Sequence, residues 1–280
     1  MDDDHVRLAV SNIAWEPSED DSIADTLRRA GVGGVEIAPT KWRERPLEAS
    51  SADIAAYRRA WADRGLPIVS IQSLLFGRPD LQLFGDERSR VAMLGYLCRI
   101  IELSAALGAR TLVFGSPKNR VRGSLPMTNA FDIARDFFRS VGAHAREHGV
   151  IVCVEANPPA YGCDFITTTT GAVDLCRAVD DAGIRINADL GGMTMSNENV
   201  SESLHAAAPL LGHFHASEPN LGPLGAAADH AAAAAALGDI QYTGWVSIEM
   251  RAAGNANDGD NVVAVERAVH GATTAYGRAI

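Results

Sequence analysis

Four residues in the second half of the chain could together hold a divalent cation. Glu155, Asp189 and Glu249 each end a short apolar segment, and His215 lies near the end of another. Three carboxylates in a pocket of low dielectric constant would repel one another, and a cation among them removes that repulsion. Three oxygen donors and one imidazole suit a hard-to-borderline ion. We therefore predict one bound Mn²⁺, with Mg²⁺, Co²⁺, Fe²⁺ or Zn²⁺ as alternatives.

Bringing these side chains together requires parallel strands that all end at one rim. Short segments rich in Val and Ile recur along the chain and alternate with helix-like stretches, as buried parallel strands do. Eight such strands without a long linker predict a single (β/α)8 TIM-barrel domain over residues 1–280, with a doubly wound open sheet as the main alternative. Active sites of such barrels form at the C-terminal ends of the strands, where the four residues lie. The expected strands are Leu8–Ile13, Gly34–Ala38, Ile68–Ser73, Thr111–Gly115, Val150–Glu155, Ile184–Asp189, Gly212–Ala216 and Trp245–Met250.

Two long stretches between these strands have the spacing of amphipathic helices. In Asp86–Leu107 and Asn129–His148, apolar residues recur every three or four positions, which predicts one core-facing stripe on each helix. Gly108 and Gly149 follow these stretches and precede strands, as at the C-terminal stop of a helix. The alanine-rich Asp229–Leu237 is also predicted to be helical. The two predicted stripes are Val91, Leu94, Cys98 and Ile101, and Phe131, Ala134, Phe138, Val141 and Ala145.

The composition argues against several other classes of protein. A formal net charge of −10 disfavours nucleic-acid binding, which relies on Lys and Arg at the phosphate backbone. No apolar run approaches the ~20 residues that span a bilayer, so no membrane partner is expected. Residues 1–5 lack the basic start and apolar core of a signal peptide, which predicts a cytoplasmic location. The four cysteines show no C-x-x-C spacing and are expected to be reduced thiols.

Other polar residues near the strand ends are expected to support the site. His213 lies two residues before His215, on the same side of the strand but at a different depth. We expect it to orient a ligand through a hydrogen bond and not to bind the metal directly. Arg120 offers a bidentate fork for a phosphate or carboxylate. The candidates for contact with a substrate are Glu36, Gln72, Lys118, Arg120, Asn157, Tyr161, Glu218 and Arg251.

Six segments spread over nearly the whole chain carry a family resemblance. They are Gly34–Pro39, Gln72–Gly77, Val113–Arg120, Glu155–Gly162, His213–His215 and Ser247–Glu249. They resemble the xylose isomerase-like TIM-barrel superfamily, and specifically its sugar phosphate isomerase/epimerase group. Members include ketose 3-epimerases, hydroxypyruvate isomerases, inosose dehydratases and a branch of apurinic-site endonucleases.

The resemblance implies the same four metal ligands and adds a mechanism. Glu155 and Glu249 would also act as acid/base groups on opposite faces of a small carbohydrate substrate. One glutamate would remove the proton beside a carbonyl, giving a metal-stabilised ene-diolate, and the other would return a proton. Members of the superfamily are often dimers or tetramers, so a homodimer or homotetramer is the expected assembly.

Two departures from the epimerase pattern affect the predicted reaction. The epimerases usually carry a His where this chain has Gly192, and a second Glu where it has Tyr161. The prediction is therefore an isomerase or epimerase of a small sugar, polyol or sugar-phosphate-like compound, with a lyase of the keto-inositol dehydratase type as the main alternative. A non-catalytic metal- or sugar-binding barrel is a weaker alternative. An apurinic-site endonuclease would need more histidines at the rim than this chain has.

Overall fold

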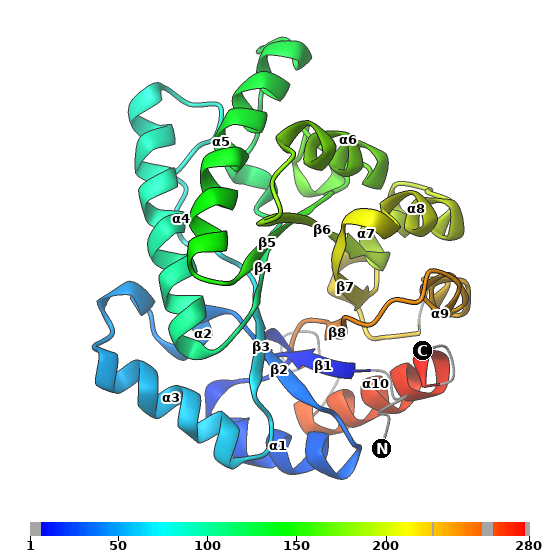
Figure 1. Cartoon of the computed structure of the whole chain (residues 1–280). Coiled ribbons are helices and arrows are strands. Elements are labelled where there is room, and N and C mark those ends of the chain that lie inside the picture. Colours follow the sequence, from blue (N-terminus) through cyan, green and yellow to red (C-terminus); the bar gives the residue numbers. More distant parts are fainter. Residues whose placement is uncertain (1–6, 226, 254–259, 278–280) are drawn as a thin grey trace.

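The strands form a closed barrel in which all neighbours are parallel (Figure 1). The structure is a computed structural model that describes residues 7–225, 227–253 and 260–277. The strands pair in chain order, and β1 pairs with β8 to close the barrel. The predicted TIM barrel is confirmed, and the open sheet is wrong. The strands are β1 Arg7–Ser11, β2 Gly34–Ile37, β3 Ile68–Ile71, β4 Thr111–Phe114, β5 Ile151–Glu155, β6 Ile184–Asp189, β7 Leu211–Ser217 and β8 Trp245–Glu249.

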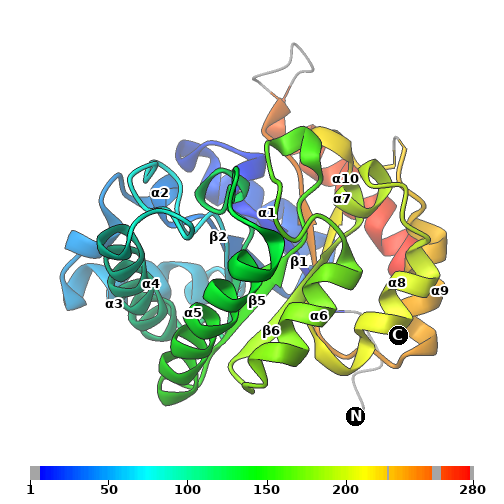
Figure 2. The same cartoon turned by 90° about the horizontal axis from the view of Figure 1, so that it is seen from above.

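Helices surround the strands, as the two views of Figures 1 and 2 show. The α-helices are α1 Asp20–Arg29, α2 Pro39–Trp42, α3 Ser51–Asp63, α4 Glu87–Leu107, α5 Met127–Glu147, α6 Thr169–Val179, α7 Leu190–Met195, α8 Val200–Ala207, α9 His230–Asp239 and α10 Asn261–Tyr276. Short 3-10 helices are η1 Asn12–Ala14, η2 Pro17–Glu19, η3 Pro46–Glu48, η4 Pro117–Asn119, η5 Pro159–Tyr161, η6 Ala208–Leu210 and η7 Pro219–Leu221. Among the helices that the structure describes, none combines the length and apolar character needed to cross a bilayer.

The ends of the long helices follow from local chemistry. The Asp86 side chain accepts a hydrogen bond from the Ser89 amide at 2.8 Å, which satisfies one of the amides that an α-helix leaves unpaired at its start. Gly108 ends α4 with a φ of +91°, a left-handed conformation that glycine adopts without a steric penalty. The predicted glycine stop is therefore confirmed there.

The buried stripe of α4 differs from the prediction. Ile101 is buried as predicted and Leu94 and Cys98 are half-buried, but Val91 is 63% exposed. The predicted positions and the observed ones both have helical spacing, and only the packing against the barrel selects between them. On α5 the prediction holds better, because Ala134, Phe138, Val141 and Ala145 are all buried. The buried residues of α4 are Met93, Leu97, Ile100, Ile101, Leu103, Ser104 and Leu107.

The strand register sets the height of the polar residues at the rim. Asp189 of β6 lies opposite His215 of β7, and Ser217 of β7 lies opposite Glu249 of β8. Because all strands are parallel, these residues gather at the C-terminal end of the barrel. The fold therefore delivers carboxylates and an imidazole from neighbouring strands to one place.

Candidate metal centre at the mouth of the barrel

The Nδ1 atom of His215 faces three carboxylates. It lies 3.2 Å from Glu249 Oε2, 3.5 Å from Glu155 Oε2 and 3.8 Å from Asp189 Oδ2. The His215 ring is completely buried, whereas the three carboxylates retain slight exposure at 11–13% of the side-chain area. The four predicted ligands therefore lie together, with the imidazole at the base and the carboxylates open toward the mouth of the barrel.

Three of these side chains are close enough to share a divalent cation, and Glu249 reaches the group through its 3.2 Å contact with His215 Nδ1. Donor atoms of Glu155, Asp189 and His215 lie within 4.8 Å of one another. Ligands held about 2.0–2.2 Å from a tetrahedral ion stand roughly 3.3–3.6 Å apart, so only small side-chain adjustments separate this arrangement from a coordination shell. Oxygen donors with one imidazole suit a hard-to-borderline divalent ion.

The pKa shifts of the cluster also indicate that positive charge stabilises it. Burial together with the charges of Glu155 and Glu249 raises the pKa of Asp189 to about 7. Burial also raises the pKa of Glu249. Burial opposes the charged form of His215, but the carboxylates of Glu36 and Glu249 outweigh it and raise the His215 pKa well above its ordinary value. Protons on Asp189 and His215 thus supply positive charge that a bound cation would replace.

The buried Glu36 carboxylate orients His215 by contacting its Nε2 atom, on the side of the ring away from the three carboxylates. The Nε2 atom of His215 lies 3.1 Å from Glu36 Oε1, while His213 Nε2 donates to Glu36 Oε2 at 2.9 Å. Ser70 Oγ also donates to Oε2 at 2.7 Å. Burial disfavours the Glu36 carboxylate, yet the two histidines hold its pKa far below the usual range. Because Nε2–H is directed at Glu36, a cation that replaced the proton on Nδ1 would meet the Nδ1 lone pair among the three carboxylates.

Two carboxylates are held by polar neighbours. The Asn157 and Asn187 amides donate to the two oxygens of Glu155, and the Asn187 bond measures 2.7 Å. Burial raises the pKa of Glu155, but hydrogen bonds from His215 and these amides outweigh that effect and lower it. The Ser217 hydroxyl donates to Asp189 Oδ2. These hydrogen bonds therefore fix the orientation of both carboxylates.

Two glycines leave room for these carboxylates. A Cβ atom added to Gly115, just after β4, would lie 2.8 Å from Glu155 Oε1. A Cβ atom on Gly192 would lie 2.9 Å from Asp189 Oδ1, which already accepts a hydrogen bond from the Gly192 amide at 2.6 Å. A residue with a side chain at either position would force a carboxylate to move.

A cavity of about 600 Å³ opens above the carboxylates. Ser73 and Ser116 lie at its wall with φ angles of +54° and +44°, a region that non-glycine residues rarely adopt and that is over-represented at functional sites. This size suits a small molecule bound deep in the barrel mouth. The cavity is lined by Gln72, Ser73, Val113, Gly115, Ser116, Pro117, Glu155, Asn157, Tyr161, Asp189, Asn220, Leu221, Glu249 and Arg251.

Half of the predicted substrate contacts lie in this lining: Gln72, Asn157, Tyr161 and Arg251. The other half do not. Lys118 is exposed on η4 outside the cavity, and Arg120 is buried with Nη2 donating to the Glu155 carbonyl at 2.6 Å. Glu36 is fully buried and contacts the Nε2 atom of His215, so it does not reach the cavity. Glu218 turns away because its carboxylate accepts hydrogen bonds from the backbone amides of residues 225, 227 and 228 and contacts His230 Nε2 at 3.0 Å.

Four residues at the site had no role predicted from the sequence: Asn187, Ser217, Ser73 and Ser116. Asn187 lies two residues before Asp189, and Ser217 lies two residues after His215. Alternation along a strand places each on the same side as its ligand, so this signal was present in the sequence. The two serines with positive φ carried no comparable signal, because their position follows from the course of the loops after β3 and β4.

Comparisons with known proteins agree with this architecture. A family model described as xylose isomerase-like TIM barrel matches residues 24–268. A D-psicose 3-epimerase of Agrobacterium fabrum is 28% identical over 130 residues. That match spans 45% of this chain and 44% of the relative, so it covers less than half of either protein.

Solved structures share the fold over almost the entire chain. A D-psicose 3-epimerase crystallised in the presence of D-fructose superposes with a TM-score of 0.80 at 18% identity, covering 97% of this chain and all of its own. A 3-keto-D-glucoside 4-epimerase of E. coli gives 0.78 at 20% identity, with 96% and 99% covered. The IOLI protein, solved with a zinc atom, gives 0.77 at 16% identity, with 98% and 99% covered. At these identities the likeness establishes the fold.

Proposed function

Because the chain belongs to the xylose isomerase-like TIM-barrel family, we propose that it is a divalent-metal-dependent isomerase or epimerase of a small sugar, polyol or sugar-phosphate-like compound. One observation carries the proposal: His215 Nδ1 faces carboxylates from three other strands at 3.2–3.8 Å, beneath a cavity large enough for such a substrate. Similarity to sugar epimerases supports it. Mn²⁺ is the favoured ion because oxygen donors predominate.

In this proposal the protein contributes binding groups and two bases. A bound metal would polarise the substrate carbonyl and stabilise the negative charge that develops on its oxygen. Glu155 and Glu249 both line the cavity, and each can exchange a proton with a carbon beside that carbonyl. Asn157 and Asn187 hold Glu155 in one orientation, so its oxygens stay directed at the substrate position.

Specificity would come from the polar wall around the two glutamates. Arg251 supplies positive charge to the lining, and Gln72 supplies an amide that also donates to Ser11. The Tyr161 hydroxyl accepts a hydrogen bond from the Asn220 amide at 2.8 Å, which ties two loops together at the mouth. Gly192 has no side chain and its amide donates to Asp189, so substrate recognition at this position must use other groups.

Exchange of solvent deuterium into substrate tests the proposal. The protein, loaded with Mn²⁺, is incubated in D₂O with ketoses, keto-inositols and hydroxypyruvate, and the carbon beside each carbonyl is followed by NMR. We expect exchange with at least one compound and its loss, by at least 100-fold, in Glu155→Gln and Glu249→Gln. Arg267→Gln, on α10 outside the centre, should exchange like the unaltered protein.

The products also separate the related reactions. An epimer or isomer has the mass of its substrate, whereas a dehydratase product is lighter by one water and absorbs in the ultraviolet. Exchange without loss of water supports the proposal. Loss of water would reassign the protein as a lyase, and absence of exchange with every compound would contradict proton abstraction.

A further inference from the structure

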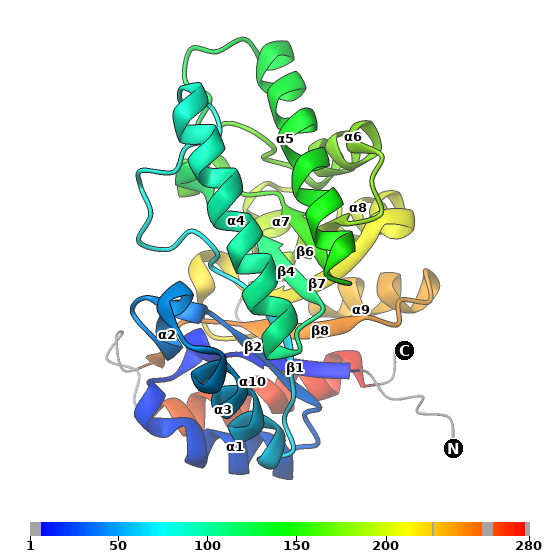
Figure 3. The ribbon, with the colours of Figure 1, turned by 60° about the vertical axis from the view of Figure 1, so that its left-hand side comes forward.

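A second group of potential metal ligands lies on the outside of the barrel, where α4 and α5 run side by side (Figures 1 and 3). Glu102 comes from α4, and His144 and His148 come from the last turn of α5 and its C-cap. One donor atom from each of these three residues lies within 4.8 Å of the others. The two histidines are four positions apart, so their rings lie on the same face of the helix with centroids 4.4 Å apart.

The tautomer of His148 leaves one of its nitrogens available. Its Nδ1 atom lies 3.0 Å from the His144 carbonyl oxygen. A carbonyl oxygen can only accept a hydrogen bond, so Nδ1 carries the proton and Nε2 carries the lone pair. A metal-binding histidine is oriented in the same way, with its second nitrogen donating to a carbonyl or carboxylate.

His144 presents a nitrogen that the described part of the chain does not satisfy. Its Nε2 atom is shielded from solvent and makes no hydrogen bond with any described residue. Glu102 Oε1 lies 3.4 Å away, close to the roughly 3.3 Å that separates two ligands of a tetrahedral zinc ion. The Nδ1 atom of His144 is 3.8 Å from Glu147 Oε2, so a further carboxylate adds negative charge beside the ring.

We propose that Glu102, His144 and His148 form a peripheral site for a borderline divalent cation such as Zn²⁺, which links α4 to α5. Two imidazoles and a carboxylate are a ligand set that zinc accepts, with water in the fourth position. The ion would join two neighbouring helices of the outer ring and stabilise the folded chain by mass action.

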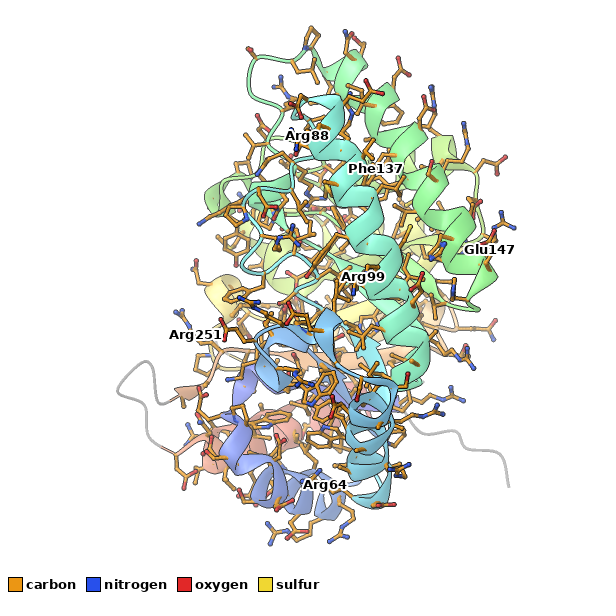
Figure 4. The ribbon with its side chains drawn as sticks, turned by 90° about the vertical axis from the view of Figure 1, so that its left-hand side faces the viewer. Arg64, Arg88, Arg99, Phe137, Glu147 and Arg251 are labelled. Atoms are coloured by element: carbon orange, nitrogen blue, oxygen red, sulfur yellow. The ribbon has the colours of Figure 1, made fainter. Side chains whose placement is uncertain are left out.

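This site is separate from the centre at the barrel mouth. His148 lies just before β5 begins at Ile151, whereas the centre lies where the strands end. Figure 4 shows Glu147, the neighbour of His148, at one end of the barrel and Arg251, which lines the central cavity, at the other. Substitutions at the peripheral site should therefore leave the central ligands in place.

Zinc stoichiometry tests the proposal on the full chain. The protein is stripped of metal, dialysed against Zn²⁺ and analysed for zinc per chain. We expect two equivalents in the unaltered protein and one in His148→Ala and in Glu102→Gln. His205→Ala, which removes an exposed histidine on α8, should keep both. Asp189→Asn should keep the peripheral ion and lose the central one.

Thermal unfolding provides the second readout. Zinc should raise the Tm of Asp189→Asn, and this increase should disappear when His148→Ala is added. Circular dichroism of each metal-free variant establishes that it is folded, and Glu102→Gln retains the test if His148→Ala fails to fold. An equal zinc content in the unaltered protein, in His148→Ala and in Glu102→Gln would overturn the proposal. The three residues would then form only a cluster of ion pairs.

Discussion

The position of Glu36 behind the candidate metal centre leads to the most specific prediction. Glu36 Oε2 accepts hydrogen bonds from His213 Nε2 at 2.9 Å and from His215 Nε2 at 3.3 Å, and the other oxygen, Oε1, lies 3.1 Å from His215 Nε2. Glu36→Gln keeps the size of the side chain but replaces one acceptor oxygen with an amide nitrogen that can only donate. His215 Nε2 lies within 3.3 Å of both positions, so in either orientation of the amide its N–H faces an NH2 group, and His215 loses the contact that turns Nδ1 toward the carboxylates.

The size of the effect follows from the contacts that are lost. Removal of a group that orients a metal-binding histidine typically weakens metal affinity 10- to 100-fold, or about 1.4–2.7 kcal/mol. Glu36 has no exposed surface, so water cannot take over its role. The Kd for Mn²⁺ should therefore rise by about one to two orders of magnitude.

The assay is competition for Mn²⁺ between the protein and a chelator of known affinity. Glu218→Gln provides the matched control, because Glu218 is equally buried at the end of β7 but binds the following loop. It should destabilise the protein by roughly 1–3 kcal/mol in urea titration while changing the Kd less than threefold. A folded Glu36→Gln protein that binds Mn²⁺ as tightly as the unaltered chain would refute the reasoning.

Four further predictions address the site and the fold. Gly115→Ala should weaken Mn²⁺ binding at least tenfold in the same competition assay, because the added Cβ meets Glu155 Oε1 at 2.8 Å; unchanged affinity would show that this carboxylate moves freely. Gly95→Ala, in the interior of α4 with no atom near its Cβ position, should instead stabilise the chain by roughly 0.5–1 kcal/mol in urea titration. Asp86→Ala should cost about 1 kcal/mol through loss of the cap of α4, and an unaltered urea midpoint would contradict that role. Metal at 100 times its Kd should stabilise the metal-free protein by about 2.7 kcal/mol, whereas a Tm insensitive to metal would argue against a site formed only in the folded state.

The barrel and the gathering of the four candidate ligands at its mouth were predictable because each rests on a repeated local signal. Buried strands rich in Val and Ile recur between helices, and the residues at their ends meet wherever parallel strands close into a barrel. The ends of the individual strands were predicted less accurately. Leu8–Ile13 was predicted as a strand, but β1 ends at Ser11 because residues 12–14 form η1. The stripe of α4 was predicted only in part, with Ile101 buried and Val91 exposed, because two sets of positions satisfy the same helical period.

The side chains around the ligands were harder to predict, because their direction depends on tertiary contacts. Glu36 and Glu218 both lie near strand ends, and the sequence does not reveal that one faces two histidines while the other faces backbone amides. Arg120 was expected in the cavity, but its guanidinium packs inward against the Glu155 carbonyl. The peripheral cluster was missed because His144 and His148 were placed on an outer helix and Glu102 comes from a different one.

The most direct test of the account is a Mn²⁺ titration followed by electron paramagnetic resonance, in the unaltered protein and in Asp189→Asn. Mn²⁺ prefers oxygen donors, so this ion reports on the centre at the barrel mouth. We predict one bound equivalent per chain in the unaltered protein and binding at least 100-fold weaker in the variant. A protein that binds no Mn²⁺, or binds it equally well without the Asp189 carboxylate, would contradict the four-ligand centre.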